Sequence, residues 1–148
     1  MKDEDMKVAA FAVHKFRHFK PGVETRLWQL FLSRRGQEWD RFLYDVRVGK
    51  GKPAPEGISP AMRSMWEKLT QKRIDVVGWK GTSPTIIEVK HYASLSSIGQ
   101  LLGYECLWNK EHPNTPCTNL ILVCQVVDDD ILEVAGAYGV EVEVIEAV

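Results

Sequence analysis

The spacing of apolar residues along this chain changes period several times, and each period predicts a different element. Between residues 23 and 35 the apolar side chains recur at helical spacing, at Leu27, Trp28, Leu30 and Phe31. We therefore predict an amphipathic helix over 23–35 that ends before Gly36. Residues 41–48 alternate apolar and polar positions, and this period of two predicts a strand.

A stretch rich in Gly, Pro and Lys, residues 49–57, predicts a loop inside the domain. Pro60 then opens a predicted short helix that reaches Leu69. The apolar residues of this helix gather on one side, at Met62, Met65, Trp66 and Leu69. We expect these four side chains to pack into the core.

Two runs rich in β-branched residues, 73–78 and 85–90, flank a stretch that contains Gly, Ser and Pro. This pattern predicts a β-hairpin whose turn covers residues 79–84. The remaining predicted elements are a helix capped by Ser94 or Ser96 and running to about Lys110, a buried strand over 119–127, a helix over 129–138 ended by Gly139, and a strand over 140–145. The whole order predicts one α/β domain over residues 1–148, with a mixed central sheet flanked by helices.

Composition and charge narrow the class of protein. The chain has 148 residues, 45% of them hydrophobic, which is enough for one domain around a single core. Residues 1–80 carry 17 Lys and Arg against 10 Asp and Glu (net +7), whereas residues 81–148 carry 2 against 10 (net −8). The basic half fits contact with a polyanion, and the acidic half fits a metal, a partner or solvent. The alternative is uneven but solvated charge.

Cysteine usage and hydropathy disfavour several other classes. Cys106, Cys117 and Cys124 are odd in number and lack the spacing of a zinc knuckle, so reduced and mostly buried thiols are expected. The polar start of the chain and the shortness of its apolar runs predict neither a signal peptide nor a membrane span. We therefore expect a cytoplasmic protein, either of a host cell or of an element that replicates in one.

The predicted hairpin brings three charged residues together. If Gly78 and Thr85 close the turn, the register places Asp75 opposite Glu88, with β-carbons about 5 Å apart. Lys90 follows Glu88 by two residues and therefore shares its face. Two carboxylates at ~4 Å repel by about 4 kcal/mol at an effective dielectric of 20, so the pair needs a counter-charge. Lys90 supplies part of it and a Mg²⁺ ion would supply the rest; the alternative is a cross-strand salt bridge on a solvated face.

Polar residues before and after the hairpin extend this pattern. Gln100 and Tyr104 lie one turn apart on one face of the helix that follows, and Glu24 lies in the first turn of the first predicted helix. The chain thus contains, in order, Glu24, Asp75, Glu88-Val89-Lys90 and Gln100-x-x-x-Tyr104. This order resembles the PD-(D/E)XK nuclease superfamily, in particular the branch with Q-x-x-x-Y after E-x-K. The resemblance covers residues 24–145 and implies a restriction-endonuclease-like αβββαβ core; Ile74 stands where the family name has Pro.

Carried over to this sequence, the resemblance implies a metal-dependent phosphodiester hydrolase. Asp75 and Glu88 would bind Mg²⁺ or Mn²⁺, with the Val89 carbonyl as a possible further ligand. Lys90 would orient the attacking water and help to deprotonate it. Glu24 would hold a metal-bound water or a second ion.

Four residues are candidates for contact with the substrate. By the same resemblance, Gln100 and Tyr104 would either contact the nucleic acid or brace Lys90. Arg73 adds a positive charge at the start of the first hairpin strand. His91 either touches a phosphate or simply ends the second strand.

Three further features have both a functional and a structural interpretation. A basic stretch interleaved with aromatic residues would either grip phosphates and stack on bases or form a solvated edge whose aromatic side chains pack inward. It comprises Lys15, Phe16, Arg17, His18, Phe19 and Lys20. Trp79, in the predicted turn, is the tryptophan to test for base stacking, and the other four are expected in packing. The run Asp128-Asp129-Asp130 is interpreted as a helix start and not as a metal site.

The leading hypothesis is therefore a Mg²⁺-dependent deoxyribonuclease, for which we expect DNA rather than RNA as the substrate. A second hypothesis is a non-catalytic component of a phage-like assembly that reuses the nuclease fold, located in the virion. A third is a nucleic-acid-binding module that needs no metal, whose affinity would fall steeply with salt. Dimerisation would suit a nuclease that cuts both strands of DNA, but no surface in the sequence indicates a homo-oligomer.

Overall fold

The computed structural model describes residue 19 and residues 22–146. The elements in chain order are α2 (Val23–Arg35), the 3₁₀ helix η1 (Gly36–Glu38), β1 (Arg41–Val48), α3 (Pro60–Thr70), β2 (Lys72–Lys80), β3 (Ser83–Tyr92), α4 (Leu95–Glu111), β4 (Asn119–Val126), α5 (Asp129–Ala137) and β5 (Val140–Val144). This confirms the predicted order of helices and strands, and the boundaries agree with the predicted ones to within about two residues.

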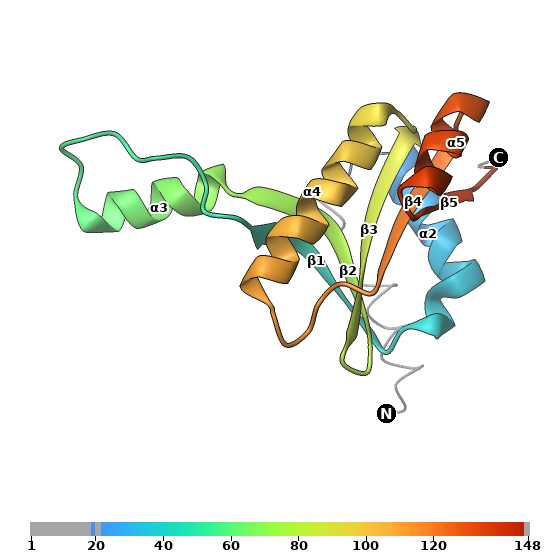
Figure 1. Cartoon of the computed structure of the whole chain (residues 1–148), viewed down its shortest axis with the longest axis horizontal. Coiled ribbons are helices and arrows are strands. Elements are labelled where there is room, and N and C mark those ends of the chain that lie inside the picture. Colours follow the sequence, from blue (N-terminus) through green and yellow to red (C-terminus); the bar gives the residue numbers. More distant parts are fainter. Residues whose placement is uncertain (1–18, 20–21, 147–148) are drawn as a thin grey trace.

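The five strands form one mixed sheet in the order β1-β2-β3-β4-β5. β2 runs antiparallel to both of its neighbours, β1 and β3, whereas β4 and β5 run parallel to β3. Parallel neighbours need a crossover, and here α4 and α5 supply the two crossovers. Both helices pack on one face of the sheet and α2 packs on the other (Figure 1). The predicted class, a mixed sheet flanked by helices, is therefore confirmed.

Each face of the sheet has its own apolar core. On the α4 and α5 side, Ile86, Leu101 and Leu122 are fully buried. On the α2 side, Trp28 and Phe31 are fully buried and belong to a group of aromatic rings that includes Phe19, Trp39, Phe42 and Tyr44. Because alternate residues of a strand point to opposite faces, β3 serves both cores, and it lies at the centre of the sheet.

The hairpin turn is shorter than predicted. Pairing continues to Trp79 with Pro84 and to Lys80 with Ser83, so two residues remain for the turn, and Gly81 takes a φ of +60°. Such a tight turn favours glycine because φ is positive. Trp79 consequently lies in β2, where it is buried and its ring centroid is 5.8 Å from that of Trp108. The predicted place of Trp79 in the turn, which made it the tryptophan to test for base stacking, was wrong.

The ribbon of β1 and β2 changes its orientation halfway along. Tyr44 of β1 contributes to the core on the α2 side, whereas Val46 packs against the core on the opposite side. In β2, Val76 belongs to the core on the α2 side, whereas Ile74 belongs to the core on the opposite side. A regular strand keeps residues two apart on one face, so both strands twist sharply at the residue between. In β1 that residue is Asp45, which has a φ of +54°.

Beyond this twist the chain extends into an arm, which we define as residues 49–73. It comprises the loop after β1, the helix α3 and the start of β2, and it projects from the body (Figure 1). In the described part of the chain no residue of α3 is buried. The prediction that the apolar side of α3 packs into the core was therefore wrong. Thr70 accepts a hydrogen bond from the Lys52 backbone N–H at 2.7 Å, and Gln71 donates one to the Gly49 carbonyl at 2.7 Å, which ties α3 to its own loop.

The helices on the α4 side begin where the sequence predicts. Ser94 is the N-cap of α4 and forms a capping box with Ser97. Asp128 caps α5 by accepting a hydrogen bond from the Ile131 N–H at 2.9 Å, as its interpretation as a helix start required. Gly139 follows α5 with a φ of +71°. Among the described residues, no helix combines the length and the apolar character needed to cross a bilayer.

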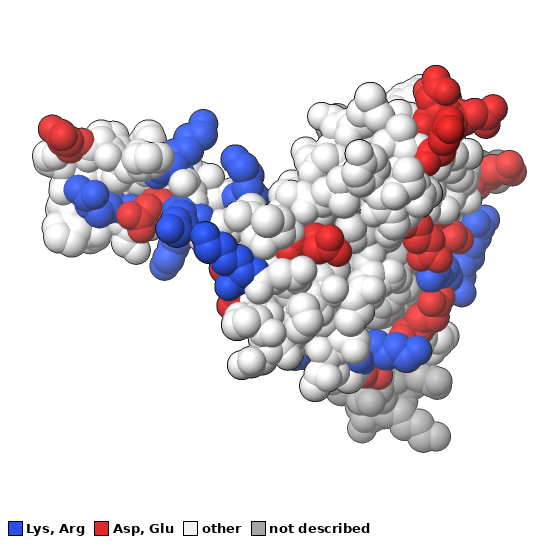
Figure 2. Space-filling model, viewed as in Figure 1, with Lys and Arg blue, Asp and Glu red and all other residues white. Residues whose placement is uncertain are grey.

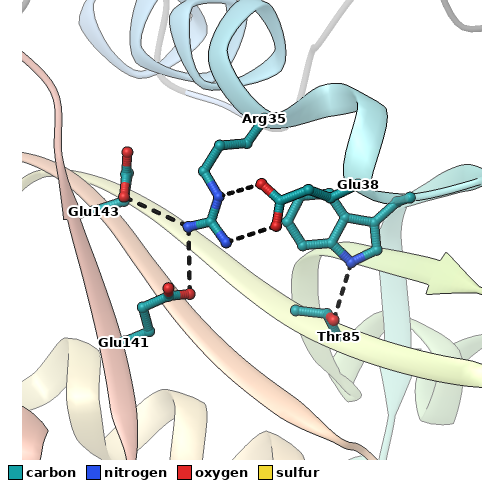
Figure 3. Close-up of polar contacts among 6 residues, drawn as sticks. Arg35, Glu38, Thr85, Glu141 and Glu143 are labelled. Atoms are coloured by element: carbon teal, nitrogen blue, oxygen red, sulfur yellow. Dashed lines mark hydrogen bonds and ion pairs between the residues drawn. The ribbon is translucent and has the colours of Figure 1, made fainter.

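A single arginine joins α2 to the edge of the sheet (Figure 3). The Arg35 guanidinium contacts Glu38 at 2.6 Å, Glu141 at 3.3 Å and Glu143 at 3.5 Å. Beside it, the Trp39 indole N–H donates to the Thr85 hydroxyl at 3.0 Å. These contacts fix the end of α2 over β5, and they leave β5 with two acidic side chains that discourage edge-to-edge pairing.

Candidate active site

The site is built where the ladder between β2 and β3 ends. The last backbone pair is Val76 with Ile87, and continuing this register places Asp75 opposite Glu88, as predicted. Here each strand donates to a side chain of the other. The Asp75 N–H donates to Glu88 Oε1 at 3.0 Å, and the Val89 N–H donates to Asp75 Oδ2 at 3.0 Å. The two carboxylates thus replace the missing ladder bonds and lie side by side.

Burial distinguishes the two carboxylates. Glu88 is 2% exposed, in the middle of the central strand, whereas Asp75 is half-buried. Burial raises the pKa of the Glu88 carboxyl well above its ordinary value, and the charge of Asp75 raises it further. The backbone hydrogen bond from Asp75 and the positive charge of Lys90 act in the opposite direction. The pair therefore holds a negative charge in a place where water provides little screening.

Lys90 and Tyr104 complete the described cluster. Lys90 is half-buried, and its charge acts on Glu88. Tyr104 of α4 packs against the core that lies between the sheet and the helices α4 and α5. Burial, followed by the charges of Glu88 and Asp75, raises the pKa of Tyr104 to about 12, so its hydroxyl keeps its proton at neutral pH. The structure thus brings Asp75, Glu88, Lys90 and Tyr104 together.

The other predicted site residues lie at different depths in the molecule. Gln100 is exposed on α4, one turn before Tyr104. Glu24 is 7% exposed in the first turn of α2, on the side of that helix that carries Leu27. Val89 is fully buried and contributes its N–H to Asp75.

Two predicted substrate contacts lie at the ends of the hairpin strands. Arg73 is exposed where β2 enters the arm, and its Nε lies 3.7 Å from Asp45 Oδ1. His91 is half-buried directly after Lys90, and its ring centroid is 4.2 Å from that of Tyr92. Of the basic stretch over 15–20, only Phe19 falls within the described residues; it is buried against Trp28, which is the structural interpretation of that position.

The chemistry of the cluster fits a hard cation better than a soft one. Its donors are carboxylate oxygens, and each carboxylate has two, of which one accepts a backbone N–H here. Oxygen donors suit Mg²⁺ and Mn²⁺. A cation would also relieve the repulsion that raises the pKa of Glu88. Within the described residues, no three His, Cys, Asp or Glu side chains are grouped to hold an ion, so the pair would need backbone or water oxygens as well.

Asp45 is a feature of the site that the sequence did not indicate. It lies between the pairs Tyr44–Val76 and Val46–Ile74, and so opposite Asp75. Its positive φ is uncommon for a residue other than glycine and marks the twist of the β1–β2 ribbon. No sequence signal marks Asp45, because the apolar residues Phe42, Tyr44, Val46 and Val48 keep their period of two past this position.

Comparison with known proteins supports the fold. No protein-family profile and no curated protein matches the sequence. Among solved structures, the chain is similar to a repair endonuclease from Pyrococcus abyssi, with a TM-score of 0.50 and 17% sequence identity. The match covers 86% of this chain and 49% of that protein, so the chain spans about half its length. At this identity the likeness establishes a nuclease-like fold.

Proposed function

We propose that this protein is a metal-dependent nuclease that hydrolyses the phosphodiester bonds of DNA. The observation that carries the proposal is the pair formed by the buried Glu88 and the half-buried Asp75. Each carboxylate accepts a backbone N–H of the opposite strand, and Lys90 and Tyr104 lie beside the pair. Buried like charges beside a lysine are costly to a fold and are typical of functional sites. The likeness to a repair endonuclease supports the same reaction class.

The acidic pair would hold the cofactor. Asp75 and Glu88 would bind Mg²⁺ or Mn²⁺, with the Val89 carbonyl as a further ligand, and Glu24 would position a water at the edge of the site. When bound, the ion would supply Lewis-acid stabilisation of the negative charge on a phosphate oxygen.

The side chains of the cluster would handle the water and the substrate. Lys90 would hold the attacking water and assist the removal of its proton. The water oxygen forms a bond to phosphorus, the bond from phosphorus to the leaving oxygen breaks, and that oxygen takes up a proton. Tyr104 keeps its own proton and would donate a hydrogen bond to a phosphate oxygen or brace Lys90.

Residues farther out would hold the substrate. Three side chains would contact the phosphate backbone on either side of the bond that is cut. They are the exposed Gln100 and Arg73 and the half-buried His91. Such contacts are electrostatic and carry no sequence information. The proposed substrate is therefore DNA without a fixed recognition sequence.

A cleavage assay tests the proposal. The purified protein is incubated with plasmid, single-stranded DNA and RNA, in Mg²⁺, in Mn²⁺ and in EDTA. We expect cleavage of DNA that EDTA abolishes. Asp75→Ala and Lys90→Ala should each lower the rate by about a hundredfold or more, because each removes a group that acts directly at the reaction centre. Asp129→Ala, at an exposed position on α5, is the matched control and should cleave at the parental rate.

Metal titration by calorimetry separates the outcomes. The parent should bind Mn²⁺ and Asp75→Ala should not. Cleavage that survives in both site variants would contradict the assignment of the site. A parent that neither cleaves nor binds metal would instead support a non-catalytic assembly component. Metal-independent binding of DNA without cleavage would support a plain nucleic-acid-binding module.

A further inference from the structure

The arm presents an apolar helix side that the described chain leaves uncovered. Met62, Met65 and Leu69 are 57%, 61% and 63% exposed, and Trp66 is 40% exposed. These residues are spaced three or four apart, so they form one side of α3. Four large apolar side chains together on a projecting helix indicate a surface that another macromolecule covers.

The charge of the arm limits what that macromolecule can be. Residues 49–73 contain six Lys or Arg against two Glu, a net charge of +4. On the helical spacing of α3, Arg63 and Lys68 flank the apolar side, one on each edge. A nucleic acid would match this positive charge but would place methionine and leucine side chains against a charged backbone. The better match is a protein surface that has apolar side chains among acidic ones.

The opposite end of the same chain has such a surface. Residues 128–146 contain seven Asp or Glu and no Lys or Arg. On α5, Leu132 is 41% exposed, and Tyr138, which follows the helix, is 62% exposed. Asp130 and Glu133 are exposed on the same helix. In Figure 2 most of the charged side chains along the arm are Lys and Arg, although some Asp and Glu lie among them. Asp and Glu side chains gather at the upper right, where Figure 1 places α5, with Lys and Arg side chains below them.

We propose that the arm of one copy docks on α5 of a second copy, and that the exchange is reciprocal. The arm and α5 lie at opposite ends of the long axis of the molecule (Figure 1). A two-fold axis perpendicular to that direction brings each arm to the partner's α5, so both contacts form together and the dimer closes. The reciprocal exchange doubles the buried area, toward the about 800 Å² on each partner that a stable interface requires.

Sedimentation equilibrium on the full chain tests the proposal. The parent should be a dimer at micromolar concentration. Met65→Asp combined with Leu69→Asp should weaken dimerisation by about a hundredfold, since two apolar anchors are lost. Ser64→Asp, on the opposite side of the same helix, is the matched control and should leave the mass unchanged. Because no residue of α3 is buried in the described chain, circular dichroism should show all variants folded.

Charge reversal identifies the surface that the arm contacts. Arg63→Glu with Lys68→Glu should weaken the dimer by about tenfold or more, and so should Asp130→Lys with Glu133→Lys. A chain with all four changes should dimerise again, within a few-fold of the parent. Asp75→Ala should dimerise normally, because this contact does not involve the acidic site.

Several results would overturn the proposal. A parent protein that stays monomeric at high micromolar concentration would contradict it. So would a dimer whose affinity does not change with the α3 substitutions, or a chain with all four charge reversals that does not dimerise again. Assemblies that keep growing with concentration would exclude a closed pair. If the α3 changes lowered DNA affinity while the mass stayed constant, the arm would be a nucleic-acid contact and the dimer proposal would fail.

Discussion

The most consequential residue of the molecule is Glu88, because it is a carboxylate at the centre of the sheet. It is 2% exposed, it faces Asp75, and its first oxygen serves as the acceptor for a backbone N–H. A buried acid with a negative neighbour favours its protonated form, whereas a bound cation favours the ionised form. Ionisation of Glu88 as the pH rises should therefore lower the stability of the metal-free protein and raise the affinity of the site for a metal ion.

Replacing Glu88 by glutamine tests this directly. The folded pKa of Glu88 lies above its ordinary value of 4.5, so its contribution to stability is present below about pH 4.5 and is lost as pH rises through the folded pKa. Glu88→Gln keeps an acceptor for the Asp75 N–H and carries no charge. In EDTA at pH 8 we expect Glu88→Gln to melt above the parent, and at pH 4 the two should melt alike.

The same melting experiment with Mg²⁺ gives the second half of the test. Added Mg²⁺ should raise the melting temperature of the parent at pH 8 and leave that of Glu88→Gln unchanged, because ligand binding to the folded state alone stabilises it. A Glu88→Gln variant that melts below the parent in EDTA at pH 8 would show that the ionised carboxylate is already compensated within the chain.

Tyr104 is the second residue whose role can be isolated. Its pKa of about 12 means that it donates a hydrogen bond but does not act as a base at neutral pH. Tyr104→Phe should lower the cleavage rate by about tenfold while leaving Mn²⁺ affinity unchanged, and the shape of the pH–rate profile below pH 9 should also be unchanged. A profile that loses a titrating step in this variant would instead assign proton transfer to the tyrosine.

At the residue scale, much of the cluster could be predicted from the sequence. The opposition of Asp75 and Glu88 follows from the hairpin register alone, and the structure has that register. The burial of Glu24 and the positive φ of Asp45 could not be predicted, since each depends on how distant elements meet. The sequence also could not indicate that the two carboxylates accept backbone N–H groups where the ladder ends.

At the element scale, apolar periodicity predicts where a helix lies but not what covers it. The helix α3 has the same kind of apolar side as α2, yet α2 packs on the sheet and α3 projects from the body. What differs is the context: the Gly- and Pro-rich loop before α3 and the twist of the ribbon at Asp45 direct α3 away from the sheet. Trp79 shows the same limit, because its place in a strand depended on a turn of two residues.

The attachment of α2 to the sheet edge gives a prediction at this scale. Arg35 is 19% exposed and contacts three carboxylates, and its side chain also lies over the rings of Phe31 and Trp39. Arg35→Ala should lower the free energy of unfolding in urea by about 1.5–3 kcal/mol, the range of hydrogen bonds to charged groups. Arg34→Ala, at the exposed neighbouring position, is the control and should cost less than about 0.5 kcal/mol.

The pH dependence of this contact has a defined sign. The hydrogen bond with Arg35 lowers the pKa of Glu38 below 4.5. The stabilisation that Glu38 contributes is therefore present above pH 4.5 and is lost as pH falls through its lowered pKa. The difference between the parent and Arg35→Ala should accordingly shrink as the pH is lowered toward 3. An undiminished difference at that pH would mean that ring packing, and not charge, is what Arg35 contributes.

At the scale of the whole molecule, the two halves of the chain carry opposite charge. Residues 1–80 have a net charge of +7 and residues 81–148 one of −8. The overall charge of −1 is therefore the sum of two large and opposite charges, and the basic half is suited to contact with a polyanion.

This asymmetry predicts how binding to DNA depends on salt. Asp75→Ala, which should bind without cutting, is titrated onto duplex DNA at 50 and 200 mM NaCl. If three phosphates are contacted, affinity should fall by roughly 40-fold between the two salt concentrations. Lys72 and Lys80 are both exposed on β2, and the double variant Lys72→Ala/Lys80→Ala should show a weaker dependence of DNA affinity on salt concentration. An affinity that does not change with salt would exclude the basic half as the binding surface.

The way the two carboxylates replace ladder bonds has an evolutionary consequence. Asp75 and Glu88 accept backbone N–H groups within the sheet, so a relative without the proposed activity would still need hydrogen-bond acceptors at both positions. Asparagine and glutamine would meet that need without mutual repulsion. Relatives that are inert scaffolds should therefore carry amides at both positions, and relatives that bind a metal ion should carry both acids.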